Sequence, residues 1–140
     1  MPLSVRILSK DDYQTLERWW VEWGWIPPPR DFLPLDGLCG GMVESDGQPV
    51  VAGFMYTTNA KVAWIDWVVS DRSYRNDDRS EAINLLLAFL EKLARQTDAK
   101  YLYALLKHKG LQESYEALGY VKGDAYNTEM IKWLQPPQPQ

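Results

Sequence analysis

The stretch SDRSYRNDDRSEAINLLLAFL, residues 70–90, joins a polar loop to a segment with a long apolar face. A helix is predicted at 79–96, and the first amides of a helix have no intrahelical partner and attract anions. Arg75 and Arg79 flank its predicted start, and guanidinium groups bind phosphate oxygens with two parallel hydrogen bonds. The residue types therefore favour a site for a phosphate or pyrophosphate group.

The same residues also fit a helix start that holds no ligand. Asp78 is a suitable N-cap, and Glu81 three residues later completes the capping-box pattern DRSE. A carboxylate of Asp78 that pointed inward would repel a phosphate by roughly a few kcal/mol at surface-like screening. The sequence leaves two interpretations open, an anion site built on arginine and a capped helix.

A second candidate for chemistry is Asp66, the acidic residue within the otherwise apolar segment VAWIDWVV, residues 62–69. In a regular strand, alternation puts Asp66 on the face of Trp64 and Val68. A carboxylate that loses its water there becomes easier to protonate, which suits a general base. The alternative is that Asp66 pairs with an arginine or faces water at a sheet edge.

His108 is the single histidine and follows a strand predicted at 99–106. An imidazole with an ordinary pKa near 6.5 suits acid–base work. The alternative is an exposed loop histidine between Lys107 and Lys109. One histidine and one cysteine, Cys39, exclude an internal disulfide and predict no metal site.

Composition limits the class of protein. The 140 residues suit one domain, and hydrophobic residues at 46% with charged residues at 24% are typical of a globular chain. The net charge of −4 argues against general nucleic-acid binding. The N-terminus has no signal-peptide pattern, and no apolar run approaches the ~20 residues of a membrane span. A single cysteine favours a reducing, cytoplasmic location.

The pattern of elements predicts an α/β fold, with an α+β mixed sheet in the order β-α-loop-βββ-α-β-α-ββ. Strands are expected at 3–8, 38–44, 49–58, 62–69 and 99–106 and in a last hairpin formed by YVKG and NTEMIKWL, and helices at 11–23, 79–96 and 111–119. Asp46-Gly47 predicts a tight hairpin turn. Residues 1–134 form the expected domain, and 135–140 a disordered proline- and glutamine-rich tail.

Two local segments in this order of elements carry a resemblance. SYEALGY (114–120) is similar to the end of the fourth helix of the GNAT superfamily of N-acetyltransferases, and WVVSDRSYR (67–75) resembles the family's fourth strand. The resemblance covers nearly the whole chain. It implies the GNAT acyl-CoA N-acyltransferase fold and transfer of an acetyl group from acetyl-CoA, the co-substrate, to a primary amine of a small molecule or protein.

The resemblance also assigns roles. Tyr115 would be the general acid that protonates the leaving thiolate, although an aromatic in the core is the alternative. Backbone groups of Trp67, Val68 and Val69 would pair with the pantetheine arm. Cofactor binding by the loop would involve Arg75, Asn76, Asp77, Asp78, Arg79 and Ser80.

The chain departs from the family pattern Arg/Gln-x-x-Gly-x-Gly/Ala, since Asp78 and Ser80 stand at its glycine positions. Loops poor in glycine are expected among phage-type members. An extra residue between Val69 and Arg75 predicts a bulge or a longer turn there.

Tryptophan is abundant, with 7 residues, four of them between positions 19 and 25. In the resembling family this region covers the acceptor site, so Trp23, Trp25 and Arg30 are the predicted substrate-binding residues. The alternatives are a core role, which we favour for Trp20, or a homodimer face. The other functional hypothesis is a non-catalytic GNAT-fold protein that has lost CoA binding and acts as a protein-interaction module.

Overall fold

A computed structural model describes residues 2–74, 77–106, 109–126 and 128–135. Its centre is a five-stranded sheet in the order β1-β2-β3-β4-β5. The strands are β1 (Leu3–Ile7), β2 (Gly40–Ser45), β3 (Gln48–Thr57), β4 (Val62–Ser70) and β5 (Tyr101–Ala104). Neighbouring strands are antiparallel except β4 and β5, which are parallel. This mixed sheet confirms the predicted fold class.

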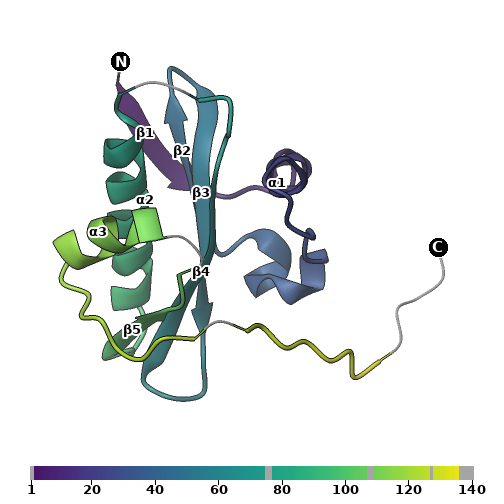
Figure 1. The fold of residues 1–140 in the computed structure, drawn as a ribbon, viewed down its shortest axis with the longest axis vertical. Helices are drawn as coiled ribbons and strands as arrows, with labels where there is room; N and C mark the ends of the chain where they lie inside the picture. The colour runs from purple at the N-terminus through teal and green to yellow at the C-terminus, as the bar shows by residue number, and fades with distance from the viewer. Residues whose placement is uncertain (1, 75–76, 107–108, 127, 136–140) are drawn as a thin grey trace.

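Helices cover both faces of the sheet (Figure 1). On one face lie α2 (Arg79–Arg95) and α3 (Lys109–Ala117); on the other lie α1 (Asp12–Glu22) and two short 3-10 turns, η1 (Arg30–Phe32) and η2 (Pro34–Gly37). Prolines at 27–29 prevent α1 from continuing and direct the chain into these turns. Among the described residues, no helix is long and apolar enough to cross a membrane.

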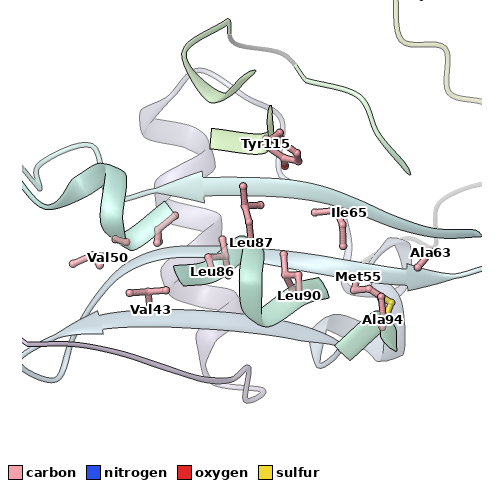
Figure 2. Close-up of a cluster of buried hydrophobic side chains, with 12 residues drawn as sticks. Val43, Val50, Met55, Ala63, Ile65, Leu86, Leu87, Leu90, Ala94 and Tyr115 are labelled. Carbon is pink, nitrogen blue, oxygen red and sulfur yellow. The ribbon is translucent and has the colours of Figure 1, made fainter. Parts of the chain in front are cut away.

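The core on the α2 face is aliphatic. Leu86, Leu87 and Leu90 of α2 pack against β3 and β4, and Tyr115 of α3 joins the same cluster (Figure 2). Gly53 of β3 lets the helix approach, because a Cβ there would lie 3.2 Å from Leu86 and 3.3 Å from Leu90. This packing fixes α2 and α3 beside the strands.

The core on the α1 face is aromatic. Trp19 and Trp20 expose 1% and 0% of their surface and pack in one cluster with Phe54 and Met42. The core role predicted for Trp20 is therefore confirmed, and Trp19 shares it. Asp12, near the start of α1, accepts hydrogen bonds of 2.8 and 2.9 Å from Arg6, which ties the helix to β1.

The turn predicted at Asp46-Gly47 is present, with φ values of 53° and 77°.

The prediction for the end of the chain is wrong. No strand follows β5 within 109–126 and 128–135, so the hairpin of YVKG and NTEMIKWL does not form there. The segment instead leaves the sheet and extends past the α1 face (Figure 1). Its side chains include the exposed residues Val121, Met130, Ile131, Trp133 and Leu134.

β5 also differs from expectation. The apolar run 99–106 predicted a strand buried on both faces, but β5 spans four residues, and Tyr101 and Tyr103 are exposed. Without the last hairpin, β5 is the edge of the described sheet. A short edge strand explains why its apolar side chains remain accessible.

Candidate functional site

A β-bulge interrupts β4 at Trp67. Ala52 of β3 pairs with Val69 and Phe54 pairs with Asp66, so β4 carries one more residue than β3 between these pairs. Trp67 has a φ of 58°, a left-handed conformation that is strained for a bulky residue. Its amide donates a 2.7 Å hydrogen bond to Oδ1 of Asp66. The bulge thus joins an unusual backbone geometry to the acidic residue of the strand.

The bulge corrects the predicted face of Asp66. Trp64 does lie on that face, because it pairs with Tyr56 two steps from the Asp66–Phe54 pair. Val68 does not, since it packs into the core on the α2 face. Trp67 instead joins the aromatic cluster on the α1 face. The extra residue sits before Val69, earlier in the chain than the sequence predicted.

β4 and β5 separate after Ile65. Their pairing runs from Val62 with Tyr101 to Ile65 with Ala104, where β5 ends, while β4 continues to Ser70. The bulged part of β4 therefore has no β5 residue beside it. Backbone groups along such an open edge can pair with an extended ligand that carries amides.

A narrow cavity, which we call the neck, lies where the two strands part. Its volume is about 30 Å³, which is enough for ordered water but not for a larger ligand group. Asp66 and Tyr115 both line it, so the structure brings together two of the predicted catalytic residues. The full lining is Trp25, Ile65, Asp66, Trp67, Val68, Leu105, Leu106, Leu111 and Tyr115.

Tyr115 is almost fully buried at the neck, with 3% of its surface exposed. Burial raises the pKa of Tyr115 well above the ordinary value for tyrosine, and the nearby Tyr120 and Asp66 raise it further. The phenol is therefore protonated at neutral pH and is a weaker acid than an ordinary tyrosine. Its ring packs edge-on against Tyr120 at 5.0 Å between centroids, so the core position weighed as the alternative is also real.

A second cavity, the entrance, continues from the neck to the start of α2. It has a volume of about 250 Å³ and shares Trp25, Val68 and Leu111 with the neck. Its lining is Trp23, Trp25, Val51, Val68, Val69, Ser70, Arg79, Ile83, Gly110 and Leu111. The predicted cofactor residues Val68, Val69 and Arg79 thus line one continuous space.

Arg79 is held in place at the entrance. Its Nη2 donates a 2.6 Å hydrogen bond to Oγ of Ser70, and its guanidinium lies 5.7 Å from the Trp23 ring. Arg72 approaches the same ring at 5.1 Å. A guanidinium has five N–H donors, so the contact with Ser70 leaves capacity for an anionic ligand. The entrance therefore carries positive charge supported by an aromatic ring.

The predicted capping box does not form at α2. The Asp78 side chain makes no capping hydrogen bond, and its Oδ1 accepts one from the hydroxyl of Tyr74 instead. Tyr74 therefore restrains the carboxylate that was expected to cap the helix or repel a phosphate. Asp77 and Ser80 are exposed. The predicted residues Arg75, Asn76 and His108 lie outside the described residues.

A third cavity, which we call the wide cavity, opens on the other side of the neck. Its volume is about 940 Å³, and it shares Asp66, Trp67, Leu105 and Leu106 with the neck. The other lining residues are Phe32, Tyr56, Thr57, Thr58, Trp64, Tyr126, Thr128, Glu129, Met130 and Ile131. Entrance, neck and wide cavity thus follow one another past the bulge of β4.

The residues predicted to bind substrate do not line the wide cavity. Trp23 and Trp25 stack at 6.4 Å between centroids and line the entrance, and neither lines the wide cavity. Trp23 donates a 2.8 Å hydrogen bond to the carbonyl of Ser70. Arg30 lies 4.5 Å over the Tyr13 ring and donates to the carbonyl of Lys10. Trp23 and Trp25 thus form part of the wall of the entrance, and Arg30 packs against α1.

Tyr56 is the main site residue that the sequence did not reveal. Its hydroxyl donates a 2.9 Å hydrogen bond to the carbonyl of Phe32. Burial raises the pKa of Tyr56 above its ordinary value, a hydrogen bond with the Trp67 side chain opposes this, and the charge of Asp66 adds to it. Counting back from the Asn59-Ala60 turn would have placed Tyr56 opposite Ala63, one residue away from its observed partner Trp64, and no sequence signal marks the bulge at Trp67.

Comparison with known proteins supports a fold assignment. No protein-family model and no curated protein matches the chain. Among solved structures, N-acetylglutamate synthase from Neisseria gonorrhoeae, complexed with coenzyme A and N-acetyl-glutamate, is similar with a TM-score of 0.65 at 19% identity. That match covers 83% of this chain, which spans 28% of the synthase.

Two smaller proteins match along nearly their whole length. A Trypanosoma brucei acetyltransferase has a TM-score of 0.62 at 18% identity, with 93% of this chain and 100% of that one covered. A ribosomal-protein-alanine N-acetyltransferase from Brucella melitensis has a TM-score of 0.61 at 12% identity, with 94% and 99% covered. At these identities the likeness shows the fold, which the three proteins share with this chain.

Proposed function

We propose, from the GNAT acetyltransferase fold that this chain adopts, that it is an enzyme that transfers an acetyl group from acetyl-CoA to a primary amine. The observation that carries the proposal is the series of three cavities past the bulge of β4, with Asp66 and Tyr115 at the narrow point between them. This arrangement separates a space for the cofactor from a space for the acceptor and leaves one position where they meet.

The entrance has groups that suit the phosphates of the cofactor and its amide-bearing arm. Arg79, together with the first amides of α2, would hold phosphate oxygens, because both are positively polarised donors. The edge of β4 beyond Ile65, open on the β5 side, would hold the amide-bearing arm. The bound cofactor would supply an activated acyl thioester.

The residues at the neck fit the proton movements of acyl transfer. Asp66 would accept a proton from the amine as its nitrogen attacks the acyl carbon. Tyr115 would donate its phenolic proton to the departing thiolate as the carbon–sulfur bond breaks; because the ordinary pKa of a thiol, about 8.5, lies below that of the phenol, the transfer is completed only as the phenolate is reprotonated. The phenolate then regains a proton from solvent. The narrowness of the neck would exclude most water from this exchange.

The proposed acceptor is a primary amine of a small molecule or protein. A cytoplasmic setting suits Cys39, which is a free cysteine in the structure.

The alternative function is a GNAT-fold interaction module without CoA binding. It draws support from the loop without glycine and from large apolar side chains exposed near the C-terminus, such as Val121 and Leu134.

Calorimetric titration with acetyl-CoA, with CoA alone as a control, tests the choice between these functions. Micromolar binding is expected, followed by release of CoA thiol when a mixture of primary amines is added. Absence of binding at high micromolar cofactor would reject the enzyme and leave the interaction module. An Arg79→Gln variant serves as the internal check, because binding at the entrance must weaken when that guanidinium is removed.

A further inference from the structure

The outer edge of β5 is open in this structure. Within the described residues, no strand pairs with β5 on the side away from β4. The backbone N–H and C=O groups along such an edge can form a hydrogen-bonded ladder with an extended segment of another chain. The four residues Tyr101–Ala104 therefore offer a place where a further strand can be added.

The space beside this edge is large enough for a strand and is mainly apolar. A cavity of about 700 Å³, which we call the edge groove, follows the whole of β5, since residues 99–105 all line it. On the α2 side, Leu102 and Ala104 pack with the aliphatic core. On the α1 side, the Tyr101 ring is exposed, and the Tyr103 ring lies 4.6 Å from that of Trp64 between centroids. A strand added here would meet apolar groups with both of its faces.

The segment after α3 has side chains that match this requirement. In an extended chain, Met130 and Leu134 point to one side and Ile131 and Trp133 to the other, so both sides are apolar. Their own chain leaves these residues largely uncovered. Met130 and Leu134 expose 86% and 89% of their surface, and Ile131 and Trp133 expose 57% each. The segment therefore carries the apolar surface of a strand but does not bury it.

The path of the segment leads away from the β5 of its own chain. Tyr126 lines both the edge groove and the wide cavity, so the chain passes around the edge of the sheet at this point. Met130 and Ile131 then line the wide cavity, and the chain extends past the α1 face (Figure 1). Residues 128–134 span about 23 Å when extended, at roughly 3.3 Å per residue. That length is sufficient to lie along the β5 of a neighbouring molecule.

We propose that two copies of this chain exchange their C-terminal segments, each adding residues 128–134 as a strand to the β5 of the other. Reciprocal exchange gives a closed dimer with twofold symmetry. Four large side chains from each copy, at roughly 150 Å² each, together with the surface that they cover, reach the ~1,200–2,000 Å² of specific interfaces. Met130 and Ile131 would leave the wide cavity on exchange and so widen it. The inference concerns assembly and does not rest on the proposed acetyl transfer.

The mass of the full chain in solution is the first measurement. Size-exclusion chromatography with light scattering at high micromolar protein should give twice the chain mass of 16.2 kDa. A monomer under these conditions would overturn the proposal. A dimer would support it, and the next two experiments decide whether the exchanged segment forms that dimer.

Cross-linking between chains tests where the segment lies. In a Cys39→Ser background, one variant carries Lys132→Cys in the segment and another carries Lys100→Cys next to β5. The two variants are mixed in urea, refolded together and treated with a short bismaleimide. We expect a cross-linked pair that contains one cysteine of each kind. If the mixed sample gives no such pair, while a chain with both cysteines cross-links within itself, the segment lies on its own β5 and the exchange is wrong.

Proline substitutions test whether the segment pairs as a strand. Successive N–H groups of an edge strand point alternately to the neighbouring strand and to solvent, and proline removes an N–H. Glu129 and Lys132 are exposed polar residues at positions of opposite parity. One of Glu129→Pro and Lys132→Pro should therefore weaken the dimer at least ~tenfold, and the other by less than about threefold. Glu129→Gln and Lys132→Gln control for the lost charges. Equal effects of the two prolines would contradict strand pairing.

Discussion

The neck and the start of α2 differ in what determines the positions of their side chains. At the neck the backbone determines them, whereas at the start of α2 contacts between side chains do. The bulge at Trp67 turns Asp66 toward one cavity and keeps Val68 on the other face. At α2, Tyr74 takes the carboxylate of Asp78 and Ser70 takes a donor of Arg79. The position of Asp66 therefore depends on the register of β4, while the positions of Asp78 and Arg79 depend on single hydrogen bonds to neighbouring side chains.

The largest effect should come from removing the proton donor at the neck. Tyr115→Phe keeps the ring that packs in the core and is expected to lower kcat by ~10³, within the range for loss of a general acid. The dissociation constant for CoA should stay within about threefold. Steady-state kinetics and calorimetry measure the two quantities separately.

Tyr120→Phe is the matched control for Tyr115. The Tyr120 ring packs against the Tyr115 ring, and its hydroxyl is buried without a hydrogen-bond partner among the described residues. This variant should therefore retain kcat. Similar losses in both variants would mean that the pair matters for packing and not for proton transfer.

The bulge itself can be disturbed without changing a polar group. A Cβ on Gly53 would lie 3.0 Å from Cγ2 of Val68, so Gly53→Val forces β4 or α2 to shift. A displacement of about 1 Å at a reacting centre can cost ~10² in rate, and overpacking typically costs about 1–3 kcal/mol of stability. Gly53→Ala should give smaller losses of both kinds. Urea unfolding measures the loss of stability and steady-state kinetics the loss of rate, and both losses should be larger in Gly53→Val than in Gly53→Ala.

The start of α2 should respond more weakly. Arg79→Gln is expected to raise the dissociation constant for CoA roughly tenfold, because a hydrogen bond to a charged group contributes about 1.5–3 kcal/mol. The rate of the bound complex should hardly change. Arg95→Gln, at the exposed end of the same helix, is the control and should bind CoA normally. A loss of kcat in Arg79→Gln would remove the contrast with the neck.

The smallest effect is expected at Asp78. Its carboxylate accepts a hydrogen bond from Tyr74, so Asp78→Asn should change CoA affinity by less than about threefold. Tyr74→Phe removes that restraint and should weaken CoA binding more than Asp78→Asn does, because the charge can then turn toward the phosphates. Tighter binding by tenfold in Asp78→Asn would show that the aspartate faces the cofactor.

The sequence predicted features that depend on local chemistry. The Asp46-Gly47 turn, the helix at 79–96 and the strand at 62–69 have signals within a few residues of themselves, and the structure contains all three. The GNAT fold predicted from the order of elements and from 114–120 is likewise confirmed by the solved structures.

Features that depend on distant contacts could not be predicted. A tryptophan with positive φ has no sequence signature, so the bulge that decides the face of Asp66 was predicted after Val69 and not at Trp67. Asp78 fits the pattern of an N-cap, but a tyrosine four residues away competes for its carboxylate. The hairpin predicted from YVKG and NTEMIKWL does not form within the described residues, although β5 leaves an edge of the sheet open.

The position of Trp23 gives the protein an internal optical probe. Indole emission responds to charge and polarity near the ring, and this ring lies between Arg72 and Arg79 and lines the entrance. A polyphosphate that drew either guanidinium away would change the emission of Trp23, while Trp20, fully enclosed in the core, would give a constant background. Fluorescence can therefore follow cofactor binding on the unlabelled chain.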